Sequence, residues 1–143
     1  MATLKVTIKE ELILNGKDMG NENFLSISGV NSAEHRIVEV ATAEQSILLF
    51  DSAVAAGTYA DSTLKHLRLT NLDDTNFIQI RIVASSQQYY AKIEPGETFI
   101  LGNSEMYADA TGSSSSEAFV NIDAIHAKAN TAACELEVFI ATT

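Results

Sequence analysis

Apolar and polar side chains alternate along the middle of this chain, residues 64–101, with the period of two that is typical of β-strands. The clearest part has Ile78, Ile80 and Ile82 at every second position, so one face of that segment is uniformly branched and aliphatic. The pattern predicts four short strands, each with one face on a core and with no helix among them.

Turn signals separate these expected strands. Residues 73–76 are Asp-Asp-Thr-Asn, whose side chains cap tight turns, and Pro95-Gly96 has the residue order of a type II turn. We therefore expect an antiparallel sheet over this part of the chain.

The first thirty residues carry a weaker version of the same pattern. Leu4, Val6 and Ile8 alternate with polar residues, and Asn15-Gly16 predicts a hairpin because both residues tolerate positive φ. The return segment is polar over residues 17–23, and the next strand is expected at 24–28. The apolar face is thin. We therefore expect residues 1–30 to be an N-terminal arm or hairpin, packed on the main domain or swapped onto another subunit.

Between the arm and the central block the pattern is mixed. We expect a loop at residues 29–34, a strand at 36–41, and a strand at 47–50 that is covered on both faces. A helix over residues 39–50 is the less favoured alternative, because β-branched residues flank it. A helical turn is expected at residues 53–56, before Gly57.

The last third of the chain begins with a Ser-rich loop, residues 111–116. Strands are expected where Ala118, Val120 and Ile122 alternate with other residues, and again over residues 134–140. In all, about nine to eleven short strands predict an all-β fold. We expect residues 31–143 to form a single antiparallel β-sandwich or Greek-key barrel, with the N-terminal arm attached.

Composition limits the possible partners. A chain of 143 residues is large enough for one domain with its own core, and a net charge of −10 disfavours binding to nucleic acid or to anionic lipid. Residues 1–7 are typical of a strand rather than a signal peptide, and no segment is apolar enough to span a membrane. We expect a protein made in a cytoplasm, with Cys134 as a buried thiol.

The residue types that commonly bind metals are not spaced like the ligands of a metal site. His35, His66 and His126 are far apart, and none has a second His or a Cys beside it. Residues 73–76 lack the alternating acids and distal Glu of a calcium loop. We expect no metal site and no cofactor.

Catalytic motifs are also missing. There is no Trp, Tyr89 and Tyr90 lie on opposite faces of their strand, and no nucleophile elbow or phosphate-binding loop is present. A hydrolase that uses acids near turns is the weakest hypothesis; its acids are Asp73, Asp74, Glu94 and Glu97. We expect no enzyme and no catalytic residues.

Several phrases of the sequence, in their order, resemble small β-rich virion proteins of tailed bacteriophages, particularly marine and cyanobacterial ones. The phrases are MATLKVTIKE (1–10), ISGVN (27–31), RIVEVATAE (36–44), AGTY (56–59), LRLTNLDDTN (67–76) and KIEPGETFI (92–100). The resemblance implies a structural component of the virion, made in the host cytoplasm. It implies a capsid decoration (cement) protein that stabilises the head shell as a homo-oligomer, often a trimer, on the major capsid protein.

The sequence leaves two questions open. The alternative function is a tail accessory or receptor-binding module, in which the Ser-rich loop, residues 112–117, contacts host surface glycan. Residues 1–14 are a candidate for pairing with a neighbouring subunit, and an edge strand within the same chain has the same sequence signature.

Overall fold

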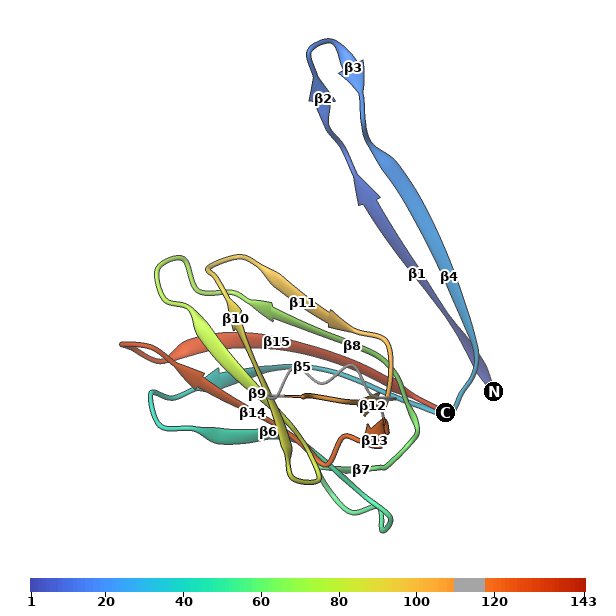
Figure 1. Ribbon diagram of the computed structural model, residues 1–143, viewed down its shortest axis with the longest axis vertical. Helices are drawn as coiled ribbons and strands as arrows, with labels where there is room; N and C mark the ends of the chain where they lie inside the picture. The colour runs from blue at the N-terminus through green and yellow to red at the C-terminus, as the bar shows by residue number, and fades with distance from the viewer. Residues whose placement is uncertain (110–117) are drawn as a thin grey trace.

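The computed structural model describes residues 1–109 and 118–143, and over these residues the fold is all-β (Figure 1). The Ser-rich loop of residues 111–116 lies outside the described residues. The strands are β1 (Ala2–Glu10), β2 (Ile13–Leu14), β3 (Lys17–Asp18), β4 (Asn21–Val30), β5 (Ser32–Val40), β6 (Gln45–Asp51), β7 (Thr58–Ala60), β8 (Leu64–Asn71), β9 (Ile78–Ala84), β10 (Gln87–Ile93), β11 (Thr98–Leu101), β12 (Glu105–Met106), β13 (Val120–Asn121), β14 (Ala124–Ala129) and β15 (Cys134–Thr142).

Two sheets pack face to face and form a β-sandwich, as the alternating pattern predicts. The five-stranded sheet has the order β10-β9-β14-β6-β7, and the four-stranded sheet has the order β11-β8-β15-β5. All pairings in these two sheets are antiparallel except that of β6 with β7, which is parallel. β12 and β13 form a short ribbon at one end.

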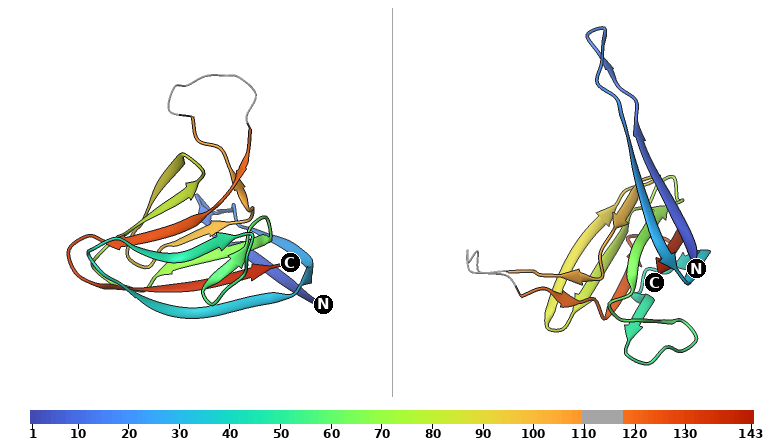
Figure 2. Two further views of the ribbon diagram at one scale, coloured as in Figure 1. Left: turned by 90° about the horizontal axis from the view of Figure 1, so that it is seen from below. Right: turned by 90° about the vertical axis from the view of Figure 1, so that its right-hand side faces the viewer.

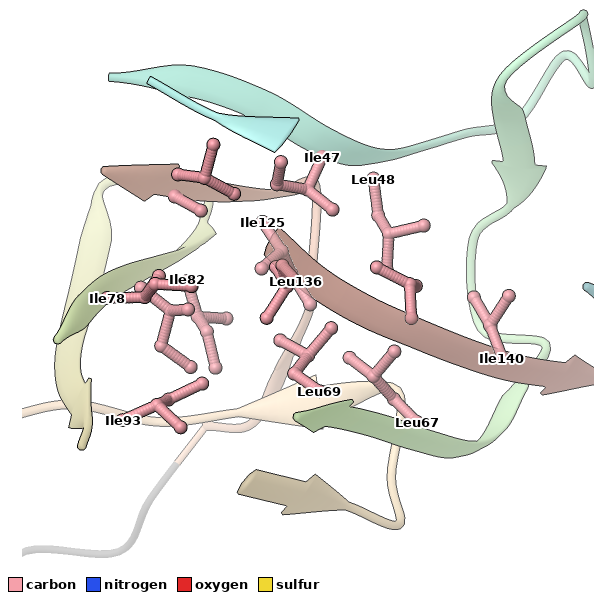
Figure 3. Close-up of a cluster of buried hydrophobic side chains, with 14 of the residues drawn as sticks. Ile47, Leu48, Leu67, Leu69, Ile78, Ile82, Ile93, Ile125, Leu136 and Ile140 are labelled. Carbon is pink, nitrogen blue, oxygen red and sulfur yellow. The ribbon is translucent and has the colours of Figure 1, made fainter. Parts of the chain in front are cut away.

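The core lies between the two sheets and consists mainly of branched aliphatic side chains (Figure 3). Ile78 and Ile80 from β9 are fully buried, as are Leu69 from β8 and Leu136 from β15. Burying one such side chain stabilises the fold by about 2–3 kcal/mol. The alternation in residues 64–101 therefore predicted both the strands and their inward faces correctly.

The predicted turns are confirmed by their geometry. The carboxylate of Asp73 accepts hydrogen bonds from the backbone N–H of Thr75 (2.8 Å) and of Asn76 (2.5 Å), which closes the turn after β8. These two bonds, that from Asn76 first, hold the pKa of Asp73 below its ordinary value. Gly96 has a φ of 74°, as the second central residue of a type II turn requires.

β6 differs from the expected strand with two covered faces. Ile47 and Leu48 are both buried, whereas Leu49 is 41% exposed. The reason is a β-bulge: Ile125 pairs with Leu48 and His126 pairs with Ser46, so Ile47 has no partner on β14. A bulge turns two successive side chains inward. The successive apolar residues Ile47 and Leu48 therefore both face the core, and no second covering layer is needed to explain them.

Two further local predictions were wrong. Residues 29–34 are strand rather than loop, since only Asn31 separates β4 from β5. Residues 53–56 form no helical turn; Ala55 instead makes a β-bridge to Thr58 around Gly57. Both segments have small or polar residues, whose local preferences are overridden by pairing with other strands.

β14 is the strand that the sequence pattern missed. The alternation at residues 118–122 yields only the two-residue β13, and the longer strand follows at Ala124–Ala129. β14 lies between β9 and β6 in the five-stranded sheet. Its buried side chains include Ala127 and Ala129, which are too small to give a strong apolar signal.

β1 and β4 form a long hairpin that leaves the sandwich beside the C-terminus and points away from it (Figures 1 and 2). At about 3.3 Å per residue, its strands and tip extend about 40 Å. Asn15 and Gly16 at the tip have φ of 52° and 76°, so the hairpin predicted there is confirmed. The return strand begins at Asn21 and not at residue 24. We refer to residues 1–30 as the arm.

Candidate interaction surface

The arm has one apolar face. Cross-strand partners point to the same side of a ribbon, and Leu4 pairs with Ile27 while Val6 pairs with Leu25. The opposite face carries mainly polar side chains, with Phe24 among them. The ribbon is therefore amphipathic, like a pair of strands that covers a core.

Much of the arm leaves its large apolar side chains in water. The exposed ones are Ile8, Leu12, Ile13, Leu14, Met19, Phe24 and Leu25, with Ile13 at 77% and Phe24 at 75% exposure. Phe24 lies on the opposite face from Leu25, but soluble proteins seldom expose this much apolar surface without a partner for it. The arm is accordingly the strongest candidate for a binding surface among the described residues.

Glycines determine the path of the arm at two points. Gly29 has a φ of 78° and forms a bulge where β4 meets the sandwich, since Ala2 pairs with Val30 and Thr3 pairs with Ser28. At the far end of the ladder, a Cβ on Gly20 would lie 2.5 Å from the carbonyl oxygen of Glu10. Gly29 fixes how the arm leaves the sandwich, and Gly20 permits the close approach near the tip.

The outer face of the four-stranded sheet lies beside the root of the arm and is polar at its centre. Arg68 donates one hydrogen bond to Glu137 (2.5 Å) and another to the hydroxyl of Thr70 (2.8 Å). Nε2 of His35 lies 2.7 Å from Glu137, and because an ionised carboxylate can only accept, the imidazole donates. The bonds from Arg68 and then His35 lower the pKa of Glu137 to about 2.

The same face brings two of the histidines to one aromatic side chain. The ring centroid of Phe139 lies 6.5 Å from that of His35 and 6.0 Å from that of His66. His66 is buried, and burial followed by the charge of Arg68 lowers its pKa. These residues are far apart in the sequence. The register of β5, β15 and β8 brings them together.

A hollow of about 300 Å³ lies between the root of the arm and this face. It is lined from the arm by residues 4–8 and from the sheet by His66, Arg68, Ile100 and Phe139. The arm diverges from the sheet beyond this hollow (Figure 2). The two surfaces thus form a wedge with apolar residues on both sides.

The other sequence candidates take ordinary structural places. His126 lies on β14, where its Nδ1 is 3.1 Å from the hydroxyl of Ser46. Glu94 and Glu97 flank the Pro95-Gly96 turn, and the carboxylate of Glu97 accepts from the N–H of Glu94. Within residues 1–109 and 118–143, no group of three His, Cys, Asp or Glu side chains is arranged to hold a metal ion.

Cys134 is buried, as its phase in the strand predicted. Burial raises the pKa of its thiol, which keeps it protonated and unreactive at neutral pH. In the part of the chain that the structure describes, no helix is long and apolar enough to cross a membrane.

Comparisons of the chain with models of known protein families, with curated proteins and with solved structures found no match.

Proposed function

We propose that this protein is a structural component of a phage virion, a capsid decoration (cement) protein that stabilises the head shell. The resemblance in the sequence supports the class of protein, and the arm supports the means of attachment. The proposed partners are the major capsid protein or other virion proteins, with the protein made in the host cytoplasm and residing in the virion. The proposed role is structural and not enzymatic, and it involves neither nucleic acid nor a membrane.

The observation that carries this proposal is the exposed apolar face of the arm. A two-stranded hairpin is marginally stable in water unless a further layer covers one face. Beyond the hollow at its root, the arm has no such layer within the described residues, and β1 and β4 pair only with each other. A neighbouring protein that covers the apolar face, or that pairs with a free edge, supplies what the ribbon lacks.

A homo-oligomer accords with the same geometry. If each arm reaches a neighbouring copy, a closed ring of copies satisfies every arm, and a trimer is the smallest ring with head-to-tail contacts. Such a ring presents rigid sandwiches around one axis and holds them on a larger shell.

The test uses purified shells that lack the protein. We expect the wild-type protein to bind them saturably and to raise their resistance to heat. Leu25→Asp places a charge on the apolar face of the arm, and we expect it to weaken binding at least tenfold. Ser26→Asp is the matched control: it is adjacent, exposed and on the opposite face, so binding changes little. Because Leu25 and Ser26 are both exposed and lie in the arm, we expect neither variant to disturb the sandwich.

Antibody-gold labelling of intact particles locates the protein. Label over the heads is the expected result. Label confined to the tail supports the alternative function, a tail accessory or receptor-binding module, and contradicts decoration of the capsid. Shells that are equally heat-resistant without the protein also contradict it.

A further inference from the structure

Two adjoining hollows lie on the outer face of the five-stranded sheet, away from the arm. One, of about 340 Å³, is lined by Phe77, Gln79, Tyr90, Ala91 and Lys92. The other, of about 220 Å³, is also lined by Phe77 and Gln79, with residues 128–130 on its far side. Phe77 and Gln79 therefore form a ridge that both hollows share, and a ligand that spans the two must cross it.

The register of three strands places a row of polar side chains across this ridge. Gln79 of β9 pairs with Lys92 of β10 on one side and with Lys128 of β14 on the other. With adjacent strands about 4.8 Å apart, the two lysine positions lie about 10 Å from each other with the amide between them. The ammonium of Lys92 lies 4.3 Å from the ring centroid of Phe77, so it holds the ring in place from one side.

Three cationic side chains gather on this face, although the chain as a whole is acidic. The chain has 19 acidic and 9 basic residues, whereas this face carries Arg81, Lys92 and Lys128. Glu44 pairs with Arg81, and Glu94 pairs with Lys92. Lys128 is exposed and borders the second hollow. Among the described residues Lys128 is in no salt bridge, so it is the cation through which this face attracts an anion.

We propose that these hollows bind an anionic oligosaccharide, a chain of sugar rings that carries carboxylate or sulfate groups. The ring of Phe77 provides a flat apolar surface for the C–H face of a sugar. The amide of Gln79 both donates to and accepts from hydroxyl groups. Lys128 is placed to contact a charged group on one side of the ridge, and Lys92, whose charge Glu94 partly offsets, borders the hollow on the other side.

The features of the site favour this ligand over the other classes of polyanion. A long nucleic acid brings many phosphates against a chain of net charge −10, and few lysines are available to neutralise them. A peptide made of acidic residues contacts the lysines but has no flat apolar face to pack on the ring of Phe77. The proposal does not depend on the arm or on the location of the protein in a virion.

The test is titration of the isotopically labelled full-length protein by NMR, with tetragalacturonate as the carboxylate probe and a chondroitin sulfate tetrasaccharide as the sulfate probe. We expect saturable shifts confined to Phe77, Gln79, Lys92, Lys128 and their neighbours. The stronger of the two probes identifies which anionic group the site prefers. No localised shift with either probe overturns the proposal.

Variants and competing ligands sharpen this test. Lys128→Gln is expected to weaken binding about fivefold, as loss of one exposed charge contact does. Lys65→Gln, at an exposed lysine on the other sheet, is the matched control and leaves binding unchanged. Equal binding of neutral maltotetraose overturns the requirement for charge. Equal binding of polyglutamate, or an unchanged affinity in Gln79→Ala, overturns recognition of a sugar.

Discussion

The sandwich and the arm have the same alternation of apolar and polar residues, yet they bury their apolar side chains to different extents. In β9 of the sandwich, Ile78 and Ile80 have no exposed surface. In the arm, the alternation of β1 and β4 leaves Ile8 43% and Leu25 52% exposed. The sandwich has a second sheet packed against its apolar face. The arm has only the hollow between residues 4–8 and the four-stranded sheet, and beyond residue 8 it has no covering layer within the described residues.

This contrast separates two kinds of information in a strand pattern. Alternation determines which side chains share a face, because the backbone of a strand places them so. What covers that face depends on the rest of the assembly. An apolar face without a covering layer therefore indicates where a partner is needed, and the following predictions probe that difference.

The largest effect is expected from truncating a side chain in the sandwich. Leu69→Ala removes a fully buried side chain, and we expect it to lower the free energy of unfolding by about 3 kcal/mol. Leu25→Ala removes the same atoms from the arm, and we expect a change within about 0.5 kcal/mol. Urea titration of the isolated protein measures both. A cost above about 2 kcal/mol for Leu25→Ala would mean that the arm is covered in solution, for example by another copy.

An intermediate effect is expected at Glu137, on the outer face beside the root of the arm. Its folded pKa of about 2 lies below the ordinary value of 4.5. The ion pair therefore contributes stability fully above about pH 4.5, and this contribution is lost as the pH falls through about 2. Because the side chain is 21% exposed, we expect Glu137→Gln to lose about 1–2 kcal/mol at pH 7.

The measurement for Glu137 is urea unfolding of wild type and Glu137→Gln at several pH values. The difference between the two proteins should shrink below about pH 4.5 and vanish near pH 2. A difference that does not change with pH contradicts the assignment of the pair, because other acids titrate equally in both proteins.

The smallest effect is expected at the junction of the two regions. Gly29→Ala meets no neighbouring atom within 4 Å, but its φ of 78° is unfavourable for a residue with a Cβ. We expect a loss of about 1 kcal/mol in the free energy of unfolding. Gly102→Ala is the matched control, since its site is equally open and lacks a positive φ. If both variants have the same stability, the bulge at Gly29 does not constrain the arm.

Much of the fold was predictable from local pattern. The strands of residues 64–101 and β15 have strong alternation and clear turns, so their inward faces followed directly. The bulge at Ile47 was not predictable, because it depends on how β14 pairs with β6. β14 itself was missed because Ala127 and Ala129 carry little apolar surface, although they lie in the middle of the five-stranded sheet.

The interaction surfaces were predictable only in part. The hairpin at Asn15-Gly16 and its thin apolar face were visible in the sequence. The grouping of Arg68, His35 and Glu137 was not, since these residues come from three strands that are distant in the chain. The same holds for the row formed by Lys92, Gln79 and Lys128, which exists only through the register of the sheet.

The uncovered arm also affects the colloidal behaviour of the isolated protein. Free ribbon edges and apolar faces make copies adhere to one another without order. The net charge of −10 opposes this, because like-charged molecules repel at long range. Acid removes that repulsion by protonating the carboxylates, whereas the exposed apolar surface of the arm does not change with pH. The acidity of the chain thus opposes aggregation of the protein at neutral pH and ceases to do so in acid.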